Sequence, residues 1–262
     1  MVKKDLGLIL AIVFASSVIS GSLVFFGMQV SGNAGAGGVT VENIEKAFDN
    51  YVKKQEQKQA EIQRQADEEE NKQIAESSKN LKPVAKNEHI RGSANAPISV
   101  VTYSDFECPY CQVFHPITEQ IVAAYPEKVN VVYRHFPLSF HDPLATREAI
   151  ASECVAELAG NNAFWKYADD LYATTTSGGN GLNDEQIVAM AVEAGVNKTA
   201  FTTCLDSGKY DKKVQQDIEE GGNAGVRGTP GNFVVNNKTG EIVFVKGAQS
   251  LAYFQTIIDP ML

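Results

Sequence analysis

The sequence has no excess of positive charge. Its 23 Lys and Arg residues stand against 32 Asp and Glu residues, so the formal net charge is −9, and no basic stripe runs along the chain. Proteins that bind nucleic acid neutralise phosphates with clustered Lys and Arg, so this balance argues against nucleic acid as a partner. The 262 residues, 44% of them hydrophobic, suffice for one well-packed domain with appendages.

Cysteine is also scarce. The chain has four cysteines: Cys108 and Cys111 form the one Cys-x-x-Cys, and Cys154 and Cys204 each stand alone. A structural zinc site needs a second pair at similar spacing, so zinc is disfavoured here, although His115 could complete an improvised site with the first pair. An inert structural disulfide is the other alternative to a redox motif. The even number of cysteines suits a compartment in which disulfides persist.

Charged side chains are absent from Leu6 to Val30. An apolar segment of this length can cross a bilayer, which takes about 20 residues, and it exceeds the core of roughly 7–15 residues in most cleavable signals. Lys3 and Lys4 would stay inside and send the rest of the chain across. We therefore expect residues 1–30 to be a transmembrane anchor, with a signal segment cleaved near residues 34–36 as the alternative. No cysteine follows the apolar run, which excludes a lipoprotein anchor.

Proline and glycine are absent from residues 41–80, which carry ten acidic and seven basic side chains. This composition favours helix, so residues 31–83 are expected to form a linker and then a charged helical stalk that ends at Pro83. The stalk begins with a heptad seam of apolar residues at Val41, Ile44, Phe48 and Tyr51. The next two core positions are polar, Gln55 and Lys58, before an apolar residue returns at Ile62. Residues 41–66 could pair two copies of the chain, but two good heptads fall short of the three or four that coiled coils use, so a solvated spacer is the alternative.

The Cys-x-x-Cys lies where an apolar strand is expected to run into a helix. A β-branched strand is predicted at 98–103, and apolar residues recur at helical spacing over 109–125. Cys108 would then stand at the helix N-terminus, where free N–H groups and the helix dipole favour a thiolate. Pro109 suits the first helical turn, which needs no N–H at that position. This context indicates a redox motif in which Cys108 reacts with substrate and Cys111, one turn further in, is a buried resolving thiol.

The chain from about residue 84 predicts an α/β domain. A second strand is expected at 129–135, mostly helical structure over about 143–221, two strands within 232–245, and a last helix over 249–258. A βαβ half followed by a β-hairpin and a helix is the plan of a thioredoxin fold, and the long helical stretch is an inserted subdomain. The expected organisation is therefore an anchor, a stalk and a thioredoxin-fold domain, at 1–30, 31–83 and 84–262.

Several further motifs accompany the Cys-x-x-Cys. They are Tyr103-Ser104-Asp105-Phe106-Glu107-Cys108-Pro109-Tyr110-Cys111, Phe114-His115-Pro116, Tyr133-Arg134-His135-Phe136-Pro137-Leu138, Glu153-Cys154, Phe164-Trp165, Cys204-Leu205-Asp206-Ser207-Gly208-Lys209-Tyr210 and Gly225-Val226-Arg227-Gly228-Thr229-Pro230. On these motifs, the chain from about Lys86 to its C-terminus resembles the DsbA-like thiol:disulfide oxidoreductases, in the membrane-anchored or exported branch of that family. The combination is far more specific than the Cys-x-x-Cys alone.

The resemblance implies roles for further residues. The bond between Thr229 and Pro230 would be cis and would face the active cysteines, so that a substrate peptide can add as a strand beside them. Pro109 and Tyr110 would tune the redox potential. Cys154 and Cys204 would form a structural disulfide in the inserted helices, with an electron-relay role for one of them as the alternative. No cofactor and no metal ion are implied.

The leading functional hypothesis is an extracytoplasmic dithiol oxidase, anchored in the membrane by its N-terminus, with the catalytic domain in the periplasm or at the cell exterior. Its partners would be exported client proteins with thiols or disulfides and a membrane redox partner that recycles the active pair. A disulfide isomerase or reductase, dimerised through the stalk, is the main alternative, because Thr before Pro230 recurs in exported isomerase relatives. A membrane-tethered assembly factor, or a metal-delivery protein that uses Cys108, Cys111 and His115, is a third.

Five polar residues near the motifs receive no catalytic role from the sequence. Asp105 and Glu107 flank the Cys-x-x-Cys and are expected to be solvated, although one of them could assist proton transfer. His115 is expected on the helix surface. His135 and His141 are expected to be packing or surface residues.

Overall fold

The computed structural model describes residues 41–85 and 87–262. The predicted membrane anchor, residues 1–30, and the linker up to residue 40 lie outside these ranges. Among the helices that the described ranges contain, none is both long enough and apolar enough to cross a membrane. The chain divides into two compact units, one up to Asp67 and one from Glu68, and each is described by itself.

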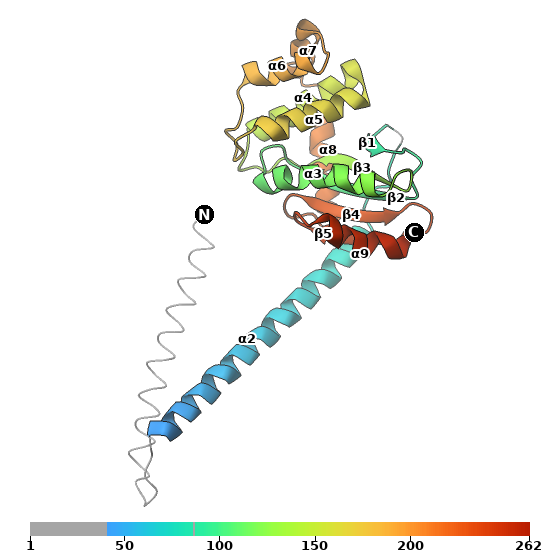
Figure 1. Ribbon diagram of the computed structural model, residues 1–262. Helices are drawn as coiled ribbons and strands as arrows, with labels where there is room; N and C mark the ends of the chain where they lie inside the picture. The colour runs from blue at the N-terminus through green and yellow to red at the C-terminus, as the bar shows by residue number, and fades with distance from the viewer. Residues whose placement is uncertain (1–40, 86) are drawn as a thin grey trace, which may run out of the picture. The chain divides into compact units, whose positions relative to one another are not determined.

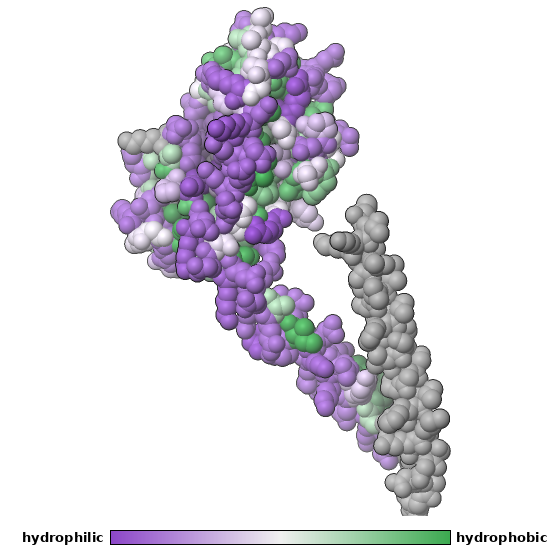
Figure 2. Space-filling model, turned by 180° about the vertical axis from the view of Figure 1, so that it is seen from behind, coloured by the Kyte–Doolittle hydropathy of each residue, from purple (hydrophilic) through white to green (hydrophobic). Residues whose placement is uncertain are grey.

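Helix α2 (Val41–Ser78) confirms the predicted stalk helix. Exposed ion pairs such as Arg64–Glu61, at 2.7 Å, join side chains one turn apart, and pairs of this kind add only about 0.3–0.5 kcal/mol each. Figure 2 shows a mainly hydrophilic helix surface with small, separate hydrophobic areas. Three apolar side chains of the heptad seam are 42%, 52% and 56% exposed: Ile44, Phe48 and Ile62. These side chains are therefore accessible, and their pairing with a second copy stays a prediction.

A five-stranded mixed sheet forms the centre of the second unit, in the order β1-β3-β2-β4-β5 (Figure 1). Its strands are β1 (His89–Gly92), β2 (Ile98–Ser104), β3 (Val129–His135), β4 (Gly231–Asn236) and β5 (Ile242–Lys246). β2 and β3 are parallel, and the other neighbouring strands are antiparallel. Four strands confirm the predicted ones to within one or two residues. β1 was not predicted, because four residues with the sequence His-Ile-Arg-Gly carry no strand periodicity.

Both faces of the sheet are covered, so β2 and β3 are buried at every position. Successive side chains of a strand point to opposite faces of the sheet, so alternate residues of β2 and β3 contribute to different cores. Val100 and Val131 belong to the core that also contains residues of α3 (Pro109–Ala124) and α9 (Leu251–Met261). Val101 belongs to a second, smaller core that continues into the segment after α8 (Asp211–Asn223). Burial on both faces explains why these strands are continuous apolar runs rather than alternating ones.

Five helices between β3 and β4 form the predicted insertion. They are α4 (Leu144–Ala159), α5 (Asn161–Thr174), α6 (Asp184–Glu193), α7 (Lys198–Leu205) and α8 (Asp211–Asn223). Figure 1 shows α4 to α7 gathered on the side of the sheet where α3 lies. A disulfide between Cys154 of α4 and Cys204 of α7 confirms the pairing that the resemblance implied. The bridge spans 50 residues, and restricting an unfolded loop of this length contributes about 4 kcal/mol of stability in the loop-entropy model.

Candidate active site

The Cys-x-x-Cys lies at the junction of β2 and α3, as predicted. Cys108 has an extended backbone (φ −86°, ψ 120°) and directly precedes α3, with Pro109 in the first turn. The N–H of Gln112 donates to the Cys108 carbonyl at 3.0 Å, so the first helical bond closes on the motif itself. The sulfur of Cys108 therefore faces the end of α3 at which the helix dipole stabilises negative charge.

Cys108 has the electrostatic character of a reactive thiol. A hydrogen bond from the Cys111 thiol is the largest influence and lowers the pKa of Cys108, and although burial opposes this, the pKa falls to about 6. The N–H groups of Cys111 and Tyr110 act in the same direction as the Cys111 thiol. The helix terminus thus contributes as the sequence predicted, but the partner thiol contributes more. At neutral pH Cys108 is mainly a thiolate.

Cys111 has the opposite character. It is 1% exposed, and burial raises its pKa well above the ordinary value, with the neighbouring Cys108 adding to the shift. This confirms the predicted burial of Cys111. Cys108 is also buried, at 3% exposure, so the two sulfurs differ in charge more than in accessibility.

The loop before β4 faces the cysteines. The bond between Thr229 and Pro230 is cis, as the resemblance implied, and a second cis bond, at Asp142–Pro143, was not predicted. The sulfur of Cys108 lies 3.4 Å from the Thr229 carbonyl oxygen, to which it donates a hydrogen bond only in its protonated form. β4 follows at once and pairs with β2, with Gly231 opposite Tyr103. The sheet thus brings residues 121 positions apart into contact at the active site.

Asp105 is a buried part of the site, which corrects the prediction that it is solvated. It is 2% exposed, and its carboxylate accepts hydrogen bonds from the N–H of Glu107 (2.8 Å), the N–H of Leu138 (2.9 Å) and the Nδ1 atom of His141 (2.7 Å). Burial raises the pKa of Asp105, and these bonds oppose the rise. His141 is buried, which agrees with the first of its two predicted roles, a packing residue rather than a surface residue. Asp105 therefore ties the turn before Cys108 to the loop after β3.

Glu107 was also predicted to be solvated, and it is fully buried. One oxygen accepts from the hydroxyl of Thr175, and the other accepts from the N–H groups of Gly179 (2.7 Å) and Gly181 (3.0 Å). Its carbonyl accepts from the N–H of Gly178 at 2.8 Å. The residue directly before Cys108 thus holds the loop between α5 and α6 of the insertion against the active site.

A substitution at Gly181 tests this anchoring. A Cβ at Gly181 would lie 1.8 Å from the Thr175 hydroxyl and 2.5 Å from a Glu107 carboxylate oxygen, so Gly181→Ala is expected to lower the free energy of unfolding by roughly 1–3 kcal/mol. Denaturant unfolding monitored by circular dichroism measures the change. Gly222→Ala is the matched control, because nothing lies within 4 Å of its Cβ. Equal stabilities of the two variants would contradict the anchoring role.

Glu148, on α4, is a buried carboxyl group that the sequence analysis missed. It is fully buried, and neither carboxyl oxygen has a hydrogen-bond partner within the described ranges. Burial, with the charges of Glu107 and Asp105 adding to it, raises the pKa of Glu148 to about 9. It is therefore protonated at neutral pH. Nothing in the local sequence signals this, since a glutamate one residue after Arg147 in a helix is typical of a solvated surface.

His115 is buried rather than on the helix surface, which corrects a further prediction. It is 7% exposed, and its Nε2 atom lies 2.6 Å from a carboxylate oxygen of Asp169. The structure does not group it with Cys108 and Cys111 as a set of metal ligands; in the part of the chain that the structure describes, three such ligand atoms come together only in another place, at His89, His135 and Glu153.

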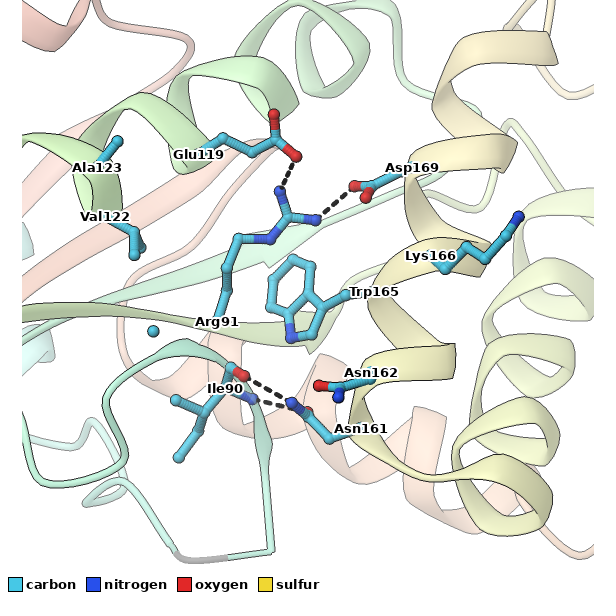
Figure 3. Close-up of a pocket in the computed structure, with 11 residues that line it drawn as sticks. Ile90, Arg91, Glu119, Val122, Ala123, Asn161, Asn162, Trp165, Lys166 and Asp169 are labelled. Carbon is cyan, nitrogen blue, oxygen red and sulfur yellow. Dashed lines mark hydrogen bonds and ion pairs between the residues drawn. The ribbon is translucent and has the colours of Figure 1, made fainter. Parts of the chain in front are cut away.

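A cavity of about 630 Å³ lies beside α3, and β1 and α5 complete its wall (Figure 3). In its wall, the Arg91 guanidinium donates to Glu119 at 2.6 Å, pairs with Asp169, and lies 4.3 Å from the centre of the Trp165 ring. The charged groups of Arg91, Glu119 and Asp169 are therefore paired with one another. The wall therefore holds β1 and α5 against α3 and presents no activated group.

Comparison with known proteins supports a common fold and family. The family described as Thioredoxin matches residues 84–260. DsbA2 of Pseudomonas aeruginosa superimposes with a TM-score of 0.60 and 27% identity, over 69% of this chain and 97% of that one. BdbD of Bacillus subtilis, at 20% identity and a TM-score of 0.60, and the catalytic domain of ScsC from Proteus mirabilis, at 21% and 0.57, share the fold. They cover 69% and 73% of this chain, and 96% and 97% of their own.

Curated relatives match over a shorter region. Na(+)/H(+) antiporter NhaA 3 of Salinispora tropica is 33% identical over 151 residues, which are 58% of this chain and 22% of the antiporter. The NhaA antiporter of Herminiimonas arsenicoxydans is 31% identical over 147 residues, or 56% and 22%. The chain thus spans about a fifth of the length of the curated relatives it matches. The antiporter names describe those longer proteins.

Proposed function

The chain belongs to the thioredoxin family, as a DsbA-like thiol:disulfide oxidoreductase, and we propose that it is a dithiol oxidase of exported proteins that works outside the cytoplasm. In the proposed reaction, a client thiolate attacks Cys108 of the oxidised Cys108–Cys111 pair. The bond between the two enzyme sulfurs breaks, and Cys111 leaves and takes up a proton. A second client thiolate then attacks the client sulfur of the mixed disulfide, and Cys108 leaves as a thiolate. The client gains a disulfide, and the enzyme is left reduced.

The contrast between the two thiols carries this proposal. With its pKa at about 6, Cys108 is the better leaving group, and Cys111, with its raised pKa, holds a proton at neutral pH. Stabilisation of the Cys108 thiolate favours the reduced pair, and a protein whose reduced form is stabilised is a stronger oxidant. The other two cysteines of the described ranges, Cys154 and Cys204, are bonded to each other, so neither offers a free thiol to this pair.

The cis-proline loop supports the binding of an extended client. Thr229 precedes Pro230 and contacts Cys108 through its carbonyl, so a client strand that pairs with this loop would bring its cysteine to the reactive sulfur. Tyr110 and Val113, on the outer side of α3, are 66% and 67% exposed. We propose that these side chains contact the client, and that Pro109 and Tyr110 tune the potential of the pair.

The reduction potential of the Cys108–Cys111 pair tests the direction of the reaction. We expect equilibration with glutathione to give a potential well above the approximately −270 mV of thioredoxin, toward the approximately −120 mV of the strongest oxidants of this fold. A Cys154→Ala/Cys204→Ala variant is the control, since it removes the second disulfide from the titration. A potential near that of thioredoxin would contradict the oxidase and favour a reductase or isomerase.

A disulfide isomerase or reductase is the second candidate, and the accessible apolar side chains of α2 are the observation that favours it. If residues 41–66 pair two copies, light scattering on the chain from Val39 onward would give the mass of a dimer. Phe48→Glu, which places a charge in the seam, would then give a monomer, and Gln63→Glu, outside the seam, would not. A monomer in all three cases would leave the stalk as a spacer.

The proposed location rests on the sequence of residues 1–30 and on the redox chemistry of the site. An anchor in the membrane would hold the catalytic domain near a membrane redox partner that reoxidises Cys108 and Cys111. Labelling of intact cells with a membrane-impermeant thiol reagent, after reduction of the pair by a membrane-impermeant reductant, tests this, because both reagents would reach Cys108 only in a domain outside the cytoplasm.

A further inference from the structure

Three buried side chains meet where the sheet contacts the insertion, apart from the thiol pair. His89 begins β1, His135 ends β3 and Glu153 lies on α4. They are 8%, 1% and 6% exposed. The Nε2 atoms of His89 and His135 lie 2.9 Å and 3.0 Å from the same carboxylate oxygen of Glu153. Two imidazoles and one carboxylate thus converge on a single point.

The spacing of these atoms suits a metal ion. One ligand atom from each residue lies within 4.8 Å of the other two, and the ligand atoms of a tetrahedral zinc ion, with bonds of about 2.0–2.2 Å, stand about 3.4 Å apart. The two short contacts, at 2.9 Å and 3.0 Å, reach that spacing with shifts of a few tenths of an ångström, and the ligand atoms of the two imidazoles lie within 4.8 Å of each other. We propose that His89, His135 and Glu153 form a binding site for a divalent transition-metal ion, represented by zinc, that is separate from Cys108 and Cys111.

The surroundings hold the two rings in place. The His89 ring stacks on Phe164, with centroids 3.7 Å apart and planes 6° from parallel. The His135 ring meets the edge of Phe164 at 6.3 Å and lies 6.1 Å from Phe106. Rings fixed by packing lose little freedom when they bind an ion, which favours binding. The Nδ1 atom of His135 is buried and has no hydrogen-bond partner within the described ranges, so ring packing and the contact of Nε2 with Glu153 set the orientation of the ring.

A cavity of about 530 Å³ reaches two of the three residues. His89 and Glu153 line it, together with Tyr133 and Lys213. A water molecule from this cavity could complete a four-coordinate ion, since three protein ligands and a water are a common zinc arrangement. A bound ion would join β1 and β3 to α4 of the insertion.

Lys213 offers a direct way to change the proposed affinity. Its Nζ atom lies 3.7 Å from Glu153 and 2.6 Å from Asp217, and its side chain is 41% exposed. A positive charge at this distance repels a cation in the site. Lys213→Gln is therefore expected to bind zinc several-fold more tightly, and the substituted side chain is itself partly exposed.

Equilibrium dialysis of the full-length chain against zinc tests the proposal, with Cys108 and Cys111 oxidised so that neither can bind the ion. We expect about one zinc ion per chain, and affinity at least about 10–100-fold weaker in His89→Asn and Glu153→Gln. His115→Asn is the matched control, because His115 is equally buried and bonds one carboxylate, Asp169, but has no third ligand. It should bind zinc as the unaltered chain does.

Absence of zinc binding by the oxidised chain would overturn the proposal, and so would equal affinity in the Glu153→Gln and unaltered chains. If His89→Asn and Glu153→Gln fail to fold, two measurements on proteins that do fold test the proposed site. Lys213→Gln must bind more tightly than the unaltered chain, and cobalt must give the intense visible absorption of a tetrahedral site. Unchanged affinity in Lys213→Gln together with a weak, octahedral cobalt spectrum would show that the ion binds elsewhere.

Discussion

Replacing Cys108 with Ser is expected to slow disulfide exchange by on the order of 1000-fold or more, because a hydroxyl cannot take part in thiol–disulfide exchange. Cys111→Ser is expected to have a different effect. Its Cys108 still reacts with a client disulfide, but the buried thiol that would attack the mixed disulfide is missing, so that intermediate accumulates. The two variants separate the roles that the lowered and raised thiol pKa values predict.

Reduction of a fluorescent disulfide peptide by the prereduced protein measures the rate, and non-reducing electrophoresis with mass spectrometry detects the mixed disulfide. The Cys154→Ala/Cys204→Ala variant is the control for general loss of cysteine, and it should retain exchange because these two residues are bonded to each other away from the pair. Full activity in Cys108→Ser would refute the assignment of the active pair. Mixed disulfides in Cys108→Ser but not in Cys111→Ser would reverse the two roles.

Replacing Glu148 with Gln is expected to stabilise the protein at neutral and alkaline pH. The pKa of this buried carboxyl is about 9 in the folded protein and about 4.3 in an unfolded chain. Between these values the unfolded chain has lost the proton that the folded protein keeps, so the unfolded state binds fewer protons. The free energy of unfolding therefore falls as pH rises through this window, with a limiting slope of about 1.4 kcal/mol per pH unit.

Glutamine is neutral in both states, so Glu148→Gln removes this contribution. At pH 7, which is about 2.7 pH units above the unfolded pKa, the variant is expected to be more stable by roughly 3–4 kcal/mol, and below pH 4 the two proteins should be nearly equal. Urea unfolding at several pH values between 4 and 9 measures the difference. Glu193→Gln is the control, since Glu193 is exposed at the end of α6. A difference between Glu148→Gln and the unaltered protein that does not grow with pH would contradict the account.

The local sequence was sufficient to predict the framework of the domain. β2 and β3 are continuous apolar runs because both of their faces are buried, and burial of that kind leaves a clear pattern. The start of α3 at Pro109 followed from the fixed φ of proline and the missing N–H. These features depend on neighbouring residues alone. The cis bond at Pro230 and the Cys154–Cys204 bridge were predicted from family resemblance instead, because neither has a local signature.

Local pattern did not reveal which polar side chains are buried around the thiols, and the predictions for Asp105, Glu107 and His115 were wrong. Asp105 and Glu107 are typical of a solvated turn when judged by their neighbours, yet His141 and the loop from Thr175 to Gly181 fold over them. These contacts join residues 36 to 74 positions apart.

The residues that react could therefore be identified from the chain alone, because a cysteine pair at a strand–helix junction carries its chemistry in its local sequence. The charge state of the groups around them was decided by tertiary structure. Burial and hydrogen bonding set a pKa, and both depend on which distant segments exclude water from a side chain. Glu148 and Glu107 are both glutamates of the same domain, and packing alone leaves one without a hydrogen-bond partner and gives the other three.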